Sequence, residues 1–175
     1  MSHPESAEHR EVIVIGAGVA GIYALHRLRN LGVDALVIEA GDDLGGTWYW
    51  NRYPGCRFDS ESYSYGYSFS KELLDEWHWK ERFSPQPENL KYLQYVVEKF
   101  ALRDGMRFNT PLEKAVWDDE ANRWTLHLGG GEVMDLRSLV ASDWSSLRAD
   151  ASEIRGSARL HRTVVSHLSL AERAN

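Results

Sequence analysis

The sequence predicts an α/β protein in which a parallel sheet with helices is followed by a small antiparallel β-meander. Residues 11–15 and 35–39 are short apolar runs of the kind that form buried strands, and residues 19–31 between them have helical periodicity. After residue 105 the pattern changes to the alternation of half-buried strands. The first half therefore predicts a βαβ unit, and the second half predicts the meander.

The βαβ unit is the best-defined part of the sequence. Its first strand, Glu11 to Ile15, is rich in β-branched residues and almost wholly apolar, as is typical of a strand buried on both faces. The helix carries apolar residues at helical spacing, and Gly32 supplies a stop signal after it. These apolar residues are Ile22, Leu25, Leu28 and Leu31. The second strand, Ala35 to Glu39, ends on a carboxylate.

The middle of the chain combines a long loop with two helices. Residues 41–69 are rich in Gly, Tyr, Ser and Trp and have no clean period, which is typical of a loop that lines a binding site. Residues 71–79 and 88–102 then predict two helices, because two prolines in the intervening residues 84–87 interrupt any single helix.

Alternating segments and turn signals predict the meander. Turn signals lie at residues 118–122 and 129–131. The predicted strands cover residues 106–109, 112–117, 123–128 and 132–136. One more buried strand is expected at residues 138–141.

Composition narrows the class of protein. The chain has 175 residues, enough for one domain with a core but short for an enzyme that holds two dinucleotides. A formal net charge of −6 does not favour a nucleic-acid binder, and a single cysteine, Cys56, gives no reason to expect an oxidising compartment. We expect a cytoplasmic protein with a disordered arm at residues 1–10, one domain at residues 11–141, and no membrane partner.

A glycine motif carries the first functional signal. Gly16, Gly18 and Gly21 have the Gly-x-Gly-x-x-Gly spacing between a predicted strand and a predicted helix, where the turn can receive a pyrophosphate at the helix N-terminus. Glu39 ends the second strand, where a carboxylate can accept hydrogen bonds from ribose and would repel a 2′-phosphate. These residues predict a dinucleotide site that disfavours NADP, while NAD and FAD stay open.

A second motif separates these two cofactors. Residues 45–55 read Gly-Gly-Thr-Trp-Tyr-Trp-Asn-Arg-Tyr-Pro-Gly, and Asp59 follows. This stretch resembles a signature of the Baeyer–Villiger monooxygenases, flavin enzymes that insert oxygen beside a ketone. The resemblance continues through residues 60–63, 67–70 and 77–79 and covers roughly residues 10–141.

The resemblance implies a Rossmann-like FAD-binding domain from a two-dinucleotide-binding flavoprotein that uses FAD and NADP. In such enzymes NADPH reduces FAD, oxygen forms a flavin C4a-peroxide, and this peroxide converts a ketone to an ester or lactone. Asp59 would be catalytic, because it would orient an arginine from later in the family's chain. The implied cofactor-binding residues are Gly16, Gly18, Ala20, Gly21, Glu39, Thr47, Trp48, Arg57, Asp59 and Leu112.

The tail departs from the family. Residues 142–175 lack a Thr-Gly-Pro-Leu-Ser-like stretch and the fingerprint Phe-x-Gly-x-x-x-His-x-x-x-Trp-Pro. Codons for the tail residues can be chosen so that the reading frame displaced by one base encodes both the Thr-Gly-Pro-Leu-Ser-like stretch and the fingerprint. We therefore expect a frameshift near Ser142, the alternative being an ordinary divergent or disordered C-terminus. Reading the coding DNA decides between them.

The expected function is the FAD-binding part of an NADPH-dependent monooxygenase acting on small ketones, in a truncated chain that does not itself turn over. Two alternatives stay open: a non-catalytic FAD-binding remnant and an NAD-linked Rossmann dehydrogenase. No metal site is expected, because His161 and His167 share no ligand spacing with acidic or thiol partners. The sequence indicates no nucleic-acid or protein partner.

Overall fold

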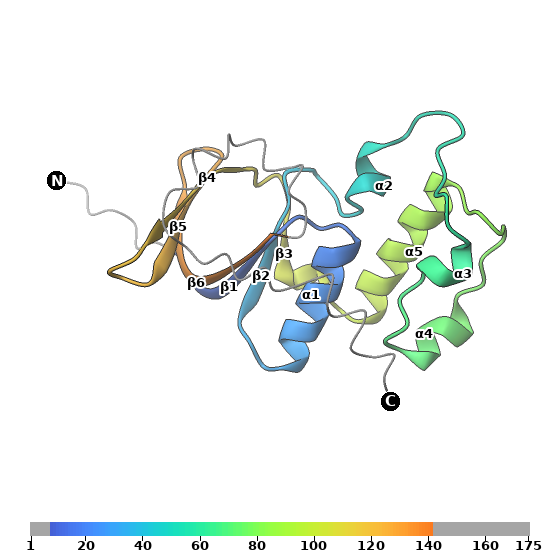
Figure 1. Cartoon of the computed structure of the whole chain (residues 1–175), viewed down its shortest axis with the longest axis horizontal. Helices are drawn as coiled ribbons and strands as arrows, with labels where there is room; N and C mark the ends of the chain where they lie inside the picture. The colour runs from blue at the N-terminus through green and yellow to red at the C-terminus, as the bar shows by residue number, and fades with distance from the viewer. Residues whose placement is uncertain (1–7, 142–175) are drawn as a thin grey trace.

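A six-stranded mixed sheet runs through the computed structural model, which describes residues 8–141 (Figure 1). The strands are β1 (Glu8–Ile15), β2 (Ala35–Ile38), β3 (Met106–Arg107), β4 (Leu112–Asp118), β5 (Arg123–Leu128) and β6 (Val133–Ala141). The helices are α1 (Val19–Asn30), α2 (Thr47–Trp50), α3 (Ser62–Tyr65), α4 (Lys71–Glu76) and α5 (Gln86–Lys99), followed by the 3-10 turn η1 (Arg103–Gly105). The strand order is β3-β2-β1-β6-β5-β4.

The predicted fold class is confirmed. Strand β1 pairs in parallel with β2 and with β6, and α1 connects β1 to β2 as expected of a βαβ unit. Strand β1 is buried on both faces, because Val14 belongs to the core against α1 and α5 while Ile13 belongs to the core against β4 and β5. This two-sided burial explains why the strand reads as a continuous apolar run.

The meander is continuous with the parallel sheet, whereas two separate strands were expected at residues 132–136 and 138–141. Both belong to the single strand β6, which pairs antiparallel with β5 through Leu136 and parallel with β1 through Ala141. The buried residues of β5 and β6 pack on the face of β1 and β2 that the helices leave uncovered. The meander therefore closes the second core.

Two further expectations need correction at the sheet. The expected strand at residues 106–109 is reduced to β3, which pairs in parallel with β2 and so does not belong to the antiparallel meander. The disordered arm was expected to reach residue 10, but β1 begins at Glu8 because its first residues pair with β6. The rest of the arm, residues 1–7, and the tail with its expected frameshift, residues 142–175, lie outside the described residues.

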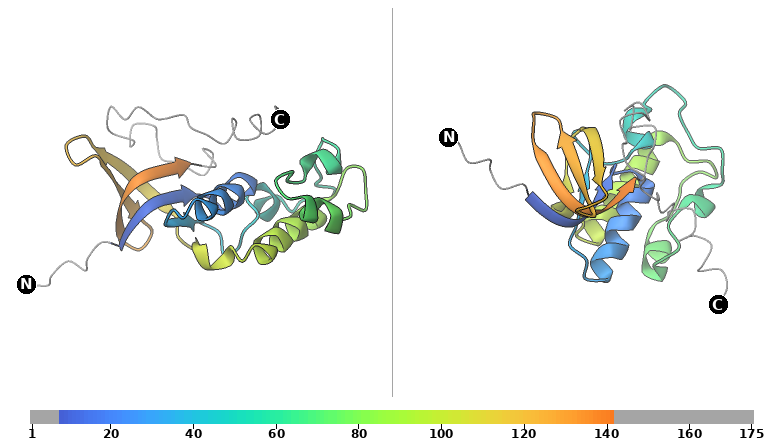
Figure 2. Two further views of the ribbon diagram at one scale, coloured as in Figure 1. Left: turned by 90° about the horizontal axis from the view of Figure 1, so that it is seen from below. Right: turned by 60° about the vertical axis from the view of Figure 1, so that its left-hand side comes forward.

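The helical part differs from expectation mainly at the helix ends. Helix α4 ends at Glu76 and not at residue 79, because Trp77 is extended and both Trp77 and Trp79 pack against Tyr92 of α5. The long loop at residues 41–69 contains the short helices α2 and α3. In Figure 2, α3 and α4 lie at the end of the molecule opposite to the β4–β5 hairpin.

Ser70 offers a small test of the helix assignment. Its side chain accepts a hydrogen bond from the Leu73 backbone N–H at 3.2 Å and so caps α4. Ser70→Ala should lower the free energy of unfolding by about 1 kcal/mol, as for other N-caps. Ser68→Ala, at an exposed position just before the helix, is the control, and an equal loss in both variants in urea titrations would contradict the capping role.

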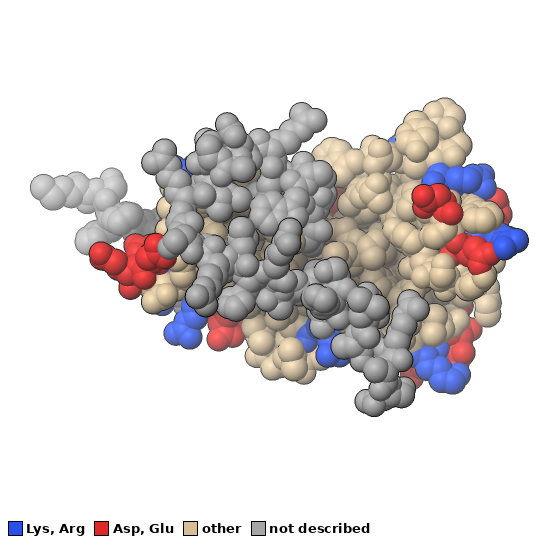
Figure 3. All heavy atoms as spheres, in the orientation of Figure 1, with Lys and Arg blue, Asp and Glu red and all other residues tan. Residues whose placement is uncertain are grey.

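Charged side chains are mixed at the helical end of the molecule. Figure 3 shows Lys and Arg interspersed with Asp and Glu over this region. Ion pairs such as Arg82 with Glu61 and Lys99 with Glu76 connect its segments. No helix within residues 8–141 is long and apolar enough to cross a membrane.

Candidate functional site

The turn between β1 and α1 has the geometry expected of a phosphate-binding loop. Gly16 has a φ of +93°, a conformation that favours glycine, and its N–H donates to the Ile38 carbonyl at 2.8 Å. Gly18 is the N-cap of α1, and no acidic residue lies in the first turn of this helix. The first backbone N–H groups of α1 therefore face a position that suits an anion.

The other two residues of the predicted glycine motif lie in α1 itself. Ala20 is partly exposed in the first turn, and Gly21 is buried. A residue without a side chain at position 21 allows the helix to approach the strands closely.

Glu39 connects the glycine turn to the end of β2. The residue is only 6% exposed, and its carboxylate accepts hydrogen bonds from the backbone N–H groups of Ala17 and Gly41, both at 2.8 Å. Its own carbonyl accepts from the Thr110 N–H at 2.8 Å. Each carboxylate oxygen keeps a further lone pair, so the group can still accept hydrogen bonds from a diol.

A second glycine loop touches the first, which the sequence did not predict. The Gly45 N–H donates to the Ala17 carbonyl at 2.9 Å. A Cβ on Gly46, whose φ is +54°, would lie 2.7 Å from the Gly18 Cα, so the two loops meet backbone to backbone. We call this pair of loops, residues 16–18 and 45–46, the glycine cradle.

Thr47 and Trp48 diverge from the glycine cradle. Thr47 is exposed at the start of α2, and its hydroxyl accepts a hydrogen bond from the Asn51 amide at 3.0 Å. Trp48 is 6% exposed, and its indole N–H donates to the Tyr65 hydroxyl at 2.7 Å. The structure therefore leaves Thr47 accessible and encloses most of the Trp48 ring.

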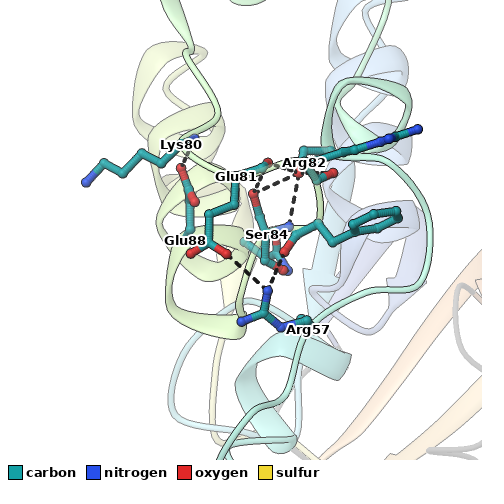
Figure 4. Close-up of polar contacts among 9 residues, drawn as sticks. Arg57, Lys80, Glu81, Arg82, Ser84 and Glu88 are labelled. Atoms are coloured by element: carbon teal, nitrogen blue, oxygen red, sulfur yellow. Dashed lines mark hydrogen bonds and ion pairs between the residues drawn. The ribbon is translucent and has the colours of Figure 1, made fainter.

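Arg57 is held within the helical region. Its guanidinium donates to the Glu81 carboxylate and to the Phe83 carbonyl, each at 3.0 Å (Figure 4). Asp59 is exposed, and no ion-pair partner for it lies within residues 8–141. The two predicted residues are thus close in sequence but differ in their surroundings, since only Arg57 is paired.

Leu112 begins β4, two residues after Thr110, and packs half-buried in the core under the meander. Because Thr110 is bonded to Glu39, the chain just before Leu112 lies beside the carboxylate. Sequence reasoning missed Gly41 and Thr110. The turn-type residues around them, including Asn109 with a φ of +52°, were the available signal.

The main surface pocket of the helical region lies away from the glycine cradle. This pocket of about 380 Å³ lies between the α4–α5 connection and α5, and its lining includes none of the predicted site residues. No group of His, Cys, Asp and Glu residues within the described part of the chain could hold a metal ion.

Comparisons with known proteins agree with this geometry. Residues 14–75 match the family described as NAD(P)-binding Rossmann-like domain. The chain is 40% identical over 156 residues to a 2-oxo-Δ3-4,5,5-trimethylcyclopentenylacetyl-CoA monooxygenase from Pseudomonas putida, covering 89% of this chain and 29% of that protein. It is 44% identical over 130 residues to an acetone monooxygenase from Gordonia sp. strain TY-5, covering 74% of this chain and 24% of that protein.

A third relative, a Baeyer–Villiger monooxygenase from Pseudooceanicola batsensis, is 42% identical over 131 residues, which cover 74% of this chain and 24% of that protein. The solved structure of an oxidized steroid monooxygenase bound to NADP superimposes with a TM-score of 0.75 at 47% identity, covering 77% of this chain and 26% of that one. The solved structure of the OTEMO complex with FAD and NADP superimposes with a TM-score of 0.72 at 44% identity. This match covers 76% of this chain and 25% of that one.

The chain spans only about a quarter of the length of these relatives. The matched residues 14–75 nevertheless include both glycine loops and strand β2. The described part of the chain is therefore homologous to the N-terminal quarter of the Baeyer–Villiger and cyclohexanone monooxygenases, which are flavin-dependent enzymes.

Proposed function

We propose that this chain binds FAD at the glycine cradle, as the FAD-binding part of a flavin monooxygenase. The observation that carries the proposal is the convergence of two glycine loops and the Glu39 carboxylate at the N-terminus of α1. The donors fit the group, because unpaired helix N–H groups suit the pyrophosphate and a carboxylate suits the ribose hydroxyls. A Cβ on Gly18 would lie 3.4 Å from the Gly46 Cα, so a side chain there would press against the second glycine loop.

Each predicted site residue has a proposed role toward one part of FAD. The glycine turn binds the pyrophosphate, Glu39 accepts hydrogen bonds from the adenosine ribose, and the backbone at Leu112 contacts the adenine. Thr47 and Trp48 stand toward the flavin end. The pyrophosphate-binding residues are Gly16, Gly18, Ala20 and Gly21.

A second cofactor is proposed for the complete protein. NADP is bound in the solved structures of steroid monooxygenase and OTEMO. Arg57 and Asp59 would lie near its nicotinamide end, where Asp59 would have the catalytic role of orienting an arginine. Since Arg57 is paired with Glu81, it would have to exchange this partner to reach an anionic cofactor. This exchange makes Glu81 part of the proposed site.

The reaction proposed for the whole protein is NADPH-dependent oxidation of a small ketone to an ester or lactone. Bound FAD supplies the redox and oxygen chemistry, and the residues of this chain bind and orient it. We expect these 175 residues to bind FAD without turnover, because they do not contain the fingerprint Phe-x-Gly-x-x-x-His-x-x-x-Trp-Pro. Cytoplasmic location is proposed from Cys56, which is buried and is the only cysteine of the sequence.

The experiment is to purify the protein, measure bound flavin per chain, and titrate the apoprotein with FAD and with NAD. Stoichiometric FAD with weak NAD binding supports the proposal. NAD binding without flavin would instead favour the Rossmann dehydrogenase. If FAD binds but NADPH is not consumed, the chain is a non-catalytic FAD-binding unit, whereas ketone oxidation would contradict the expected lack of turnover.

A further inference from the structure

Aromatic rings form an unbroken series of contacts that begins beside the glycine cradle. Trp48 follows Gly46 by two residues and contacts Phe58 and Tyr65 with ring centroids 5.7 and 5.9 Å apart. Phe58 in turn contacts Trp79 at 6.1 Å. The inner half of the series therefore leads from α2 into the α4–α5 connection.

The outer half continues to the surface of α5. Trp79 contacts Trp77 at 5.8 Å, and Trp77 contacts Tyr95 at 5.4 Å. Tyr92 contacts both tryptophans, at 4.9 Å from Trp79 and 5.3 Å from Trp77, which provides a parallel route. We call the series Trp48, Phe58, Trp79, Trp77 and Tyr95 the ring chain.

A carboxylate that can accept the phenolic proton of Tyr95 lies at the outer end of the ring chain. The Tyr95 hydroxyl donates a hydrogen bond to the Glu76 carboxylate, which also accepts bonds from the Lys99 ammonium at 2.7 and 2.9 Å. The hydrogen bonds from Lys99 and Tyr95 lower the pKa of Glu76, so this carboxylate is ionised at neutral pH. A phenol that is oxidised must lose its proton, and Tyr95 has an acceptor for it.

Among the described residues, no other polar ring in contact with the ring chain donates to a carboxylate; Tyr49, which donates to Asp42, contacts Trp50 and lies outside the ring chain. The Trp77 indole N–H is buried and has no hydrogen-bond partner among the described residues. The Tyr67 hydroxyl, which lies on a side branch through Tyr92, donates to the Val19 carbonyl, and a peptide carbonyl is far too weak a base to take the proton. These rings can be oxidised transiently, but without a proton acceptor they do not retain the oxidation.

We propose that the ring chain carries oxidising equivalents from the glycine cradle to the surface at Tyr95. A one-electron oxidant beside Trp48, such as photoexcited oxidised flavin, takes one electron from the Trp48 indole. Trp48 regains it from Trp79 by electron transfer across Phe58, which is not itself oxidised. Trp79 regains its electron from Trp77, and Trp77 from Tyr95, which also transfers its phenolic proton to Glu76. A thiol or ascorbate in solution then returns the electron to Tyr95, and Glu76 returns the proton.

Where the oxidant is flavin, the inference rests on the proposed function, so the first experiment does not use flavin. A ruthenium polypyridyl photo-oxidant is attached at exposed position 47 in a Thr47→Cys variant that also carries Cys56→Ser. The flash is given in the presence of an external electron acceptor and a spin trap, and the modified residue is then identified by mass spectrometry. We expect the trap at Tyr95.

Variants in this labelled background test each part of the chain. Tyr95→Phe should abolish the trapped tyrosyl radical, and Glu76→Gln should lower its yield several-fold. Trp77→Phe should lower the yield less, because Tyr92 provides a parallel route. Tyr63→Phe is the matched control, because Tyr63 is 68% exposed and is not part of the ring chain. Circular dichroism on each variant verifies that it is folded.

An unchanged yield in Tyr95→Phe and Glu76→Gln, or trapping on Trp48 alone, would overturn the inference. The trapping measurement is then repeated under blue light on FAD-loaded protein that carries the natural Thr47 and no ruthenium label. If FAD is not retained, the proposed function fails while the ruthenium result still decides the ring chain. If FAD is retained but Tyr95 is never oxidised in either arm, the ring chain fails and the proposed function stands.

Discussion

Gly46→Ala is expected to abolish FAD retention and to lower the free energy of unfolding by roughly 2 to 5 kcal/mol. Two effects add up at this position. The φ of +54° is strained for any residue with a Cβ, and that Cβ would lie 2.7 Å from the Gly18 Cα, a backbone atom that cannot rotate away. The two loops must therefore separate, which displaces the turn that receives the pyrophosphate. Flavin content after gel filtration and urea unfolding measure the two effects.

Gly130→Ala is the matched control for this substitution. Gly130 also has a positive φ, +86°, but a Cβ there would have no atom within 4 Å. Gly130→Ala should therefore lower the free energy of unfolding by the backbone strain alone, about 1 to 2 kcal/mol, and leave the flavin content unchanged. Should Gly46→Ala retain stoichiometric FAD and be no less stable than Gly130→Ala, the contact between the loops would not be what builds the site.

The βαβ unit could be predicted from the sequence because its signals are local. The apolar run that ends at Ile15, the glycine turn at Gly16 and the helical spacing of α1 each depend on residues within a few positions of one another. The burial of β1 on both faces then follows from the run itself, and the structure confirms it with two separate cores.

Strand pairing was harder to predict because it joins distant segments. Strand β3 has only two residues, and nothing in Met106 and Arg107 reveals that they pair with β2 some seventy residues earlier. Likewise, alternation around residues 133–141 indicates strands but does not show that one strand continues from β5 to β1. The sequence pattern therefore predicts that a strand forms, whereas the packing of the second core determines which strand it pairs with.

The candidate site was predicted as separate pieces. Spacing identified Gly18 and Glu39, but the contacts of Gly18 with Gly46 and of Ala17 with Glu39 depend on how the loops fold back. Arg57 shows the same limit, since its pairing with Glu81 joins residues 24 positions apart. Sequence reasoning placed Arg57 toward a cofactor and missed the carboxylate that holds it.

Glu39→Gln should lower the free energy of unfolding by about 1.5 to 3 kcal/mol and weaken FAD binding about tenfold or more. Both carboxylate oxygens of Glu39 accept backbone N–H groups in a buried position, from Ala17 and Gly41. Glutamine keeps the size but replaces one acceptor with a donor, so an N–H would face another N–H. The lost charge would also weaken the hydrogen bonds proposed from the ribose.

Glu11→Gln is the control, because Glu11 also accepts a backbone N–H, from Asp34 at 3.1 Å, but is exposed. Its effect should stay within about 0.5 kcal/mol, with unchanged FAD binding. FAD titrations of the folded Glu39→Gln protein then separate the two roles of this carboxylate. A loss of stability with wild-type FAD affinity would mean that Glu39 only ties the glycine turn to β2, whereas a loss of both assigns it the ribose as well.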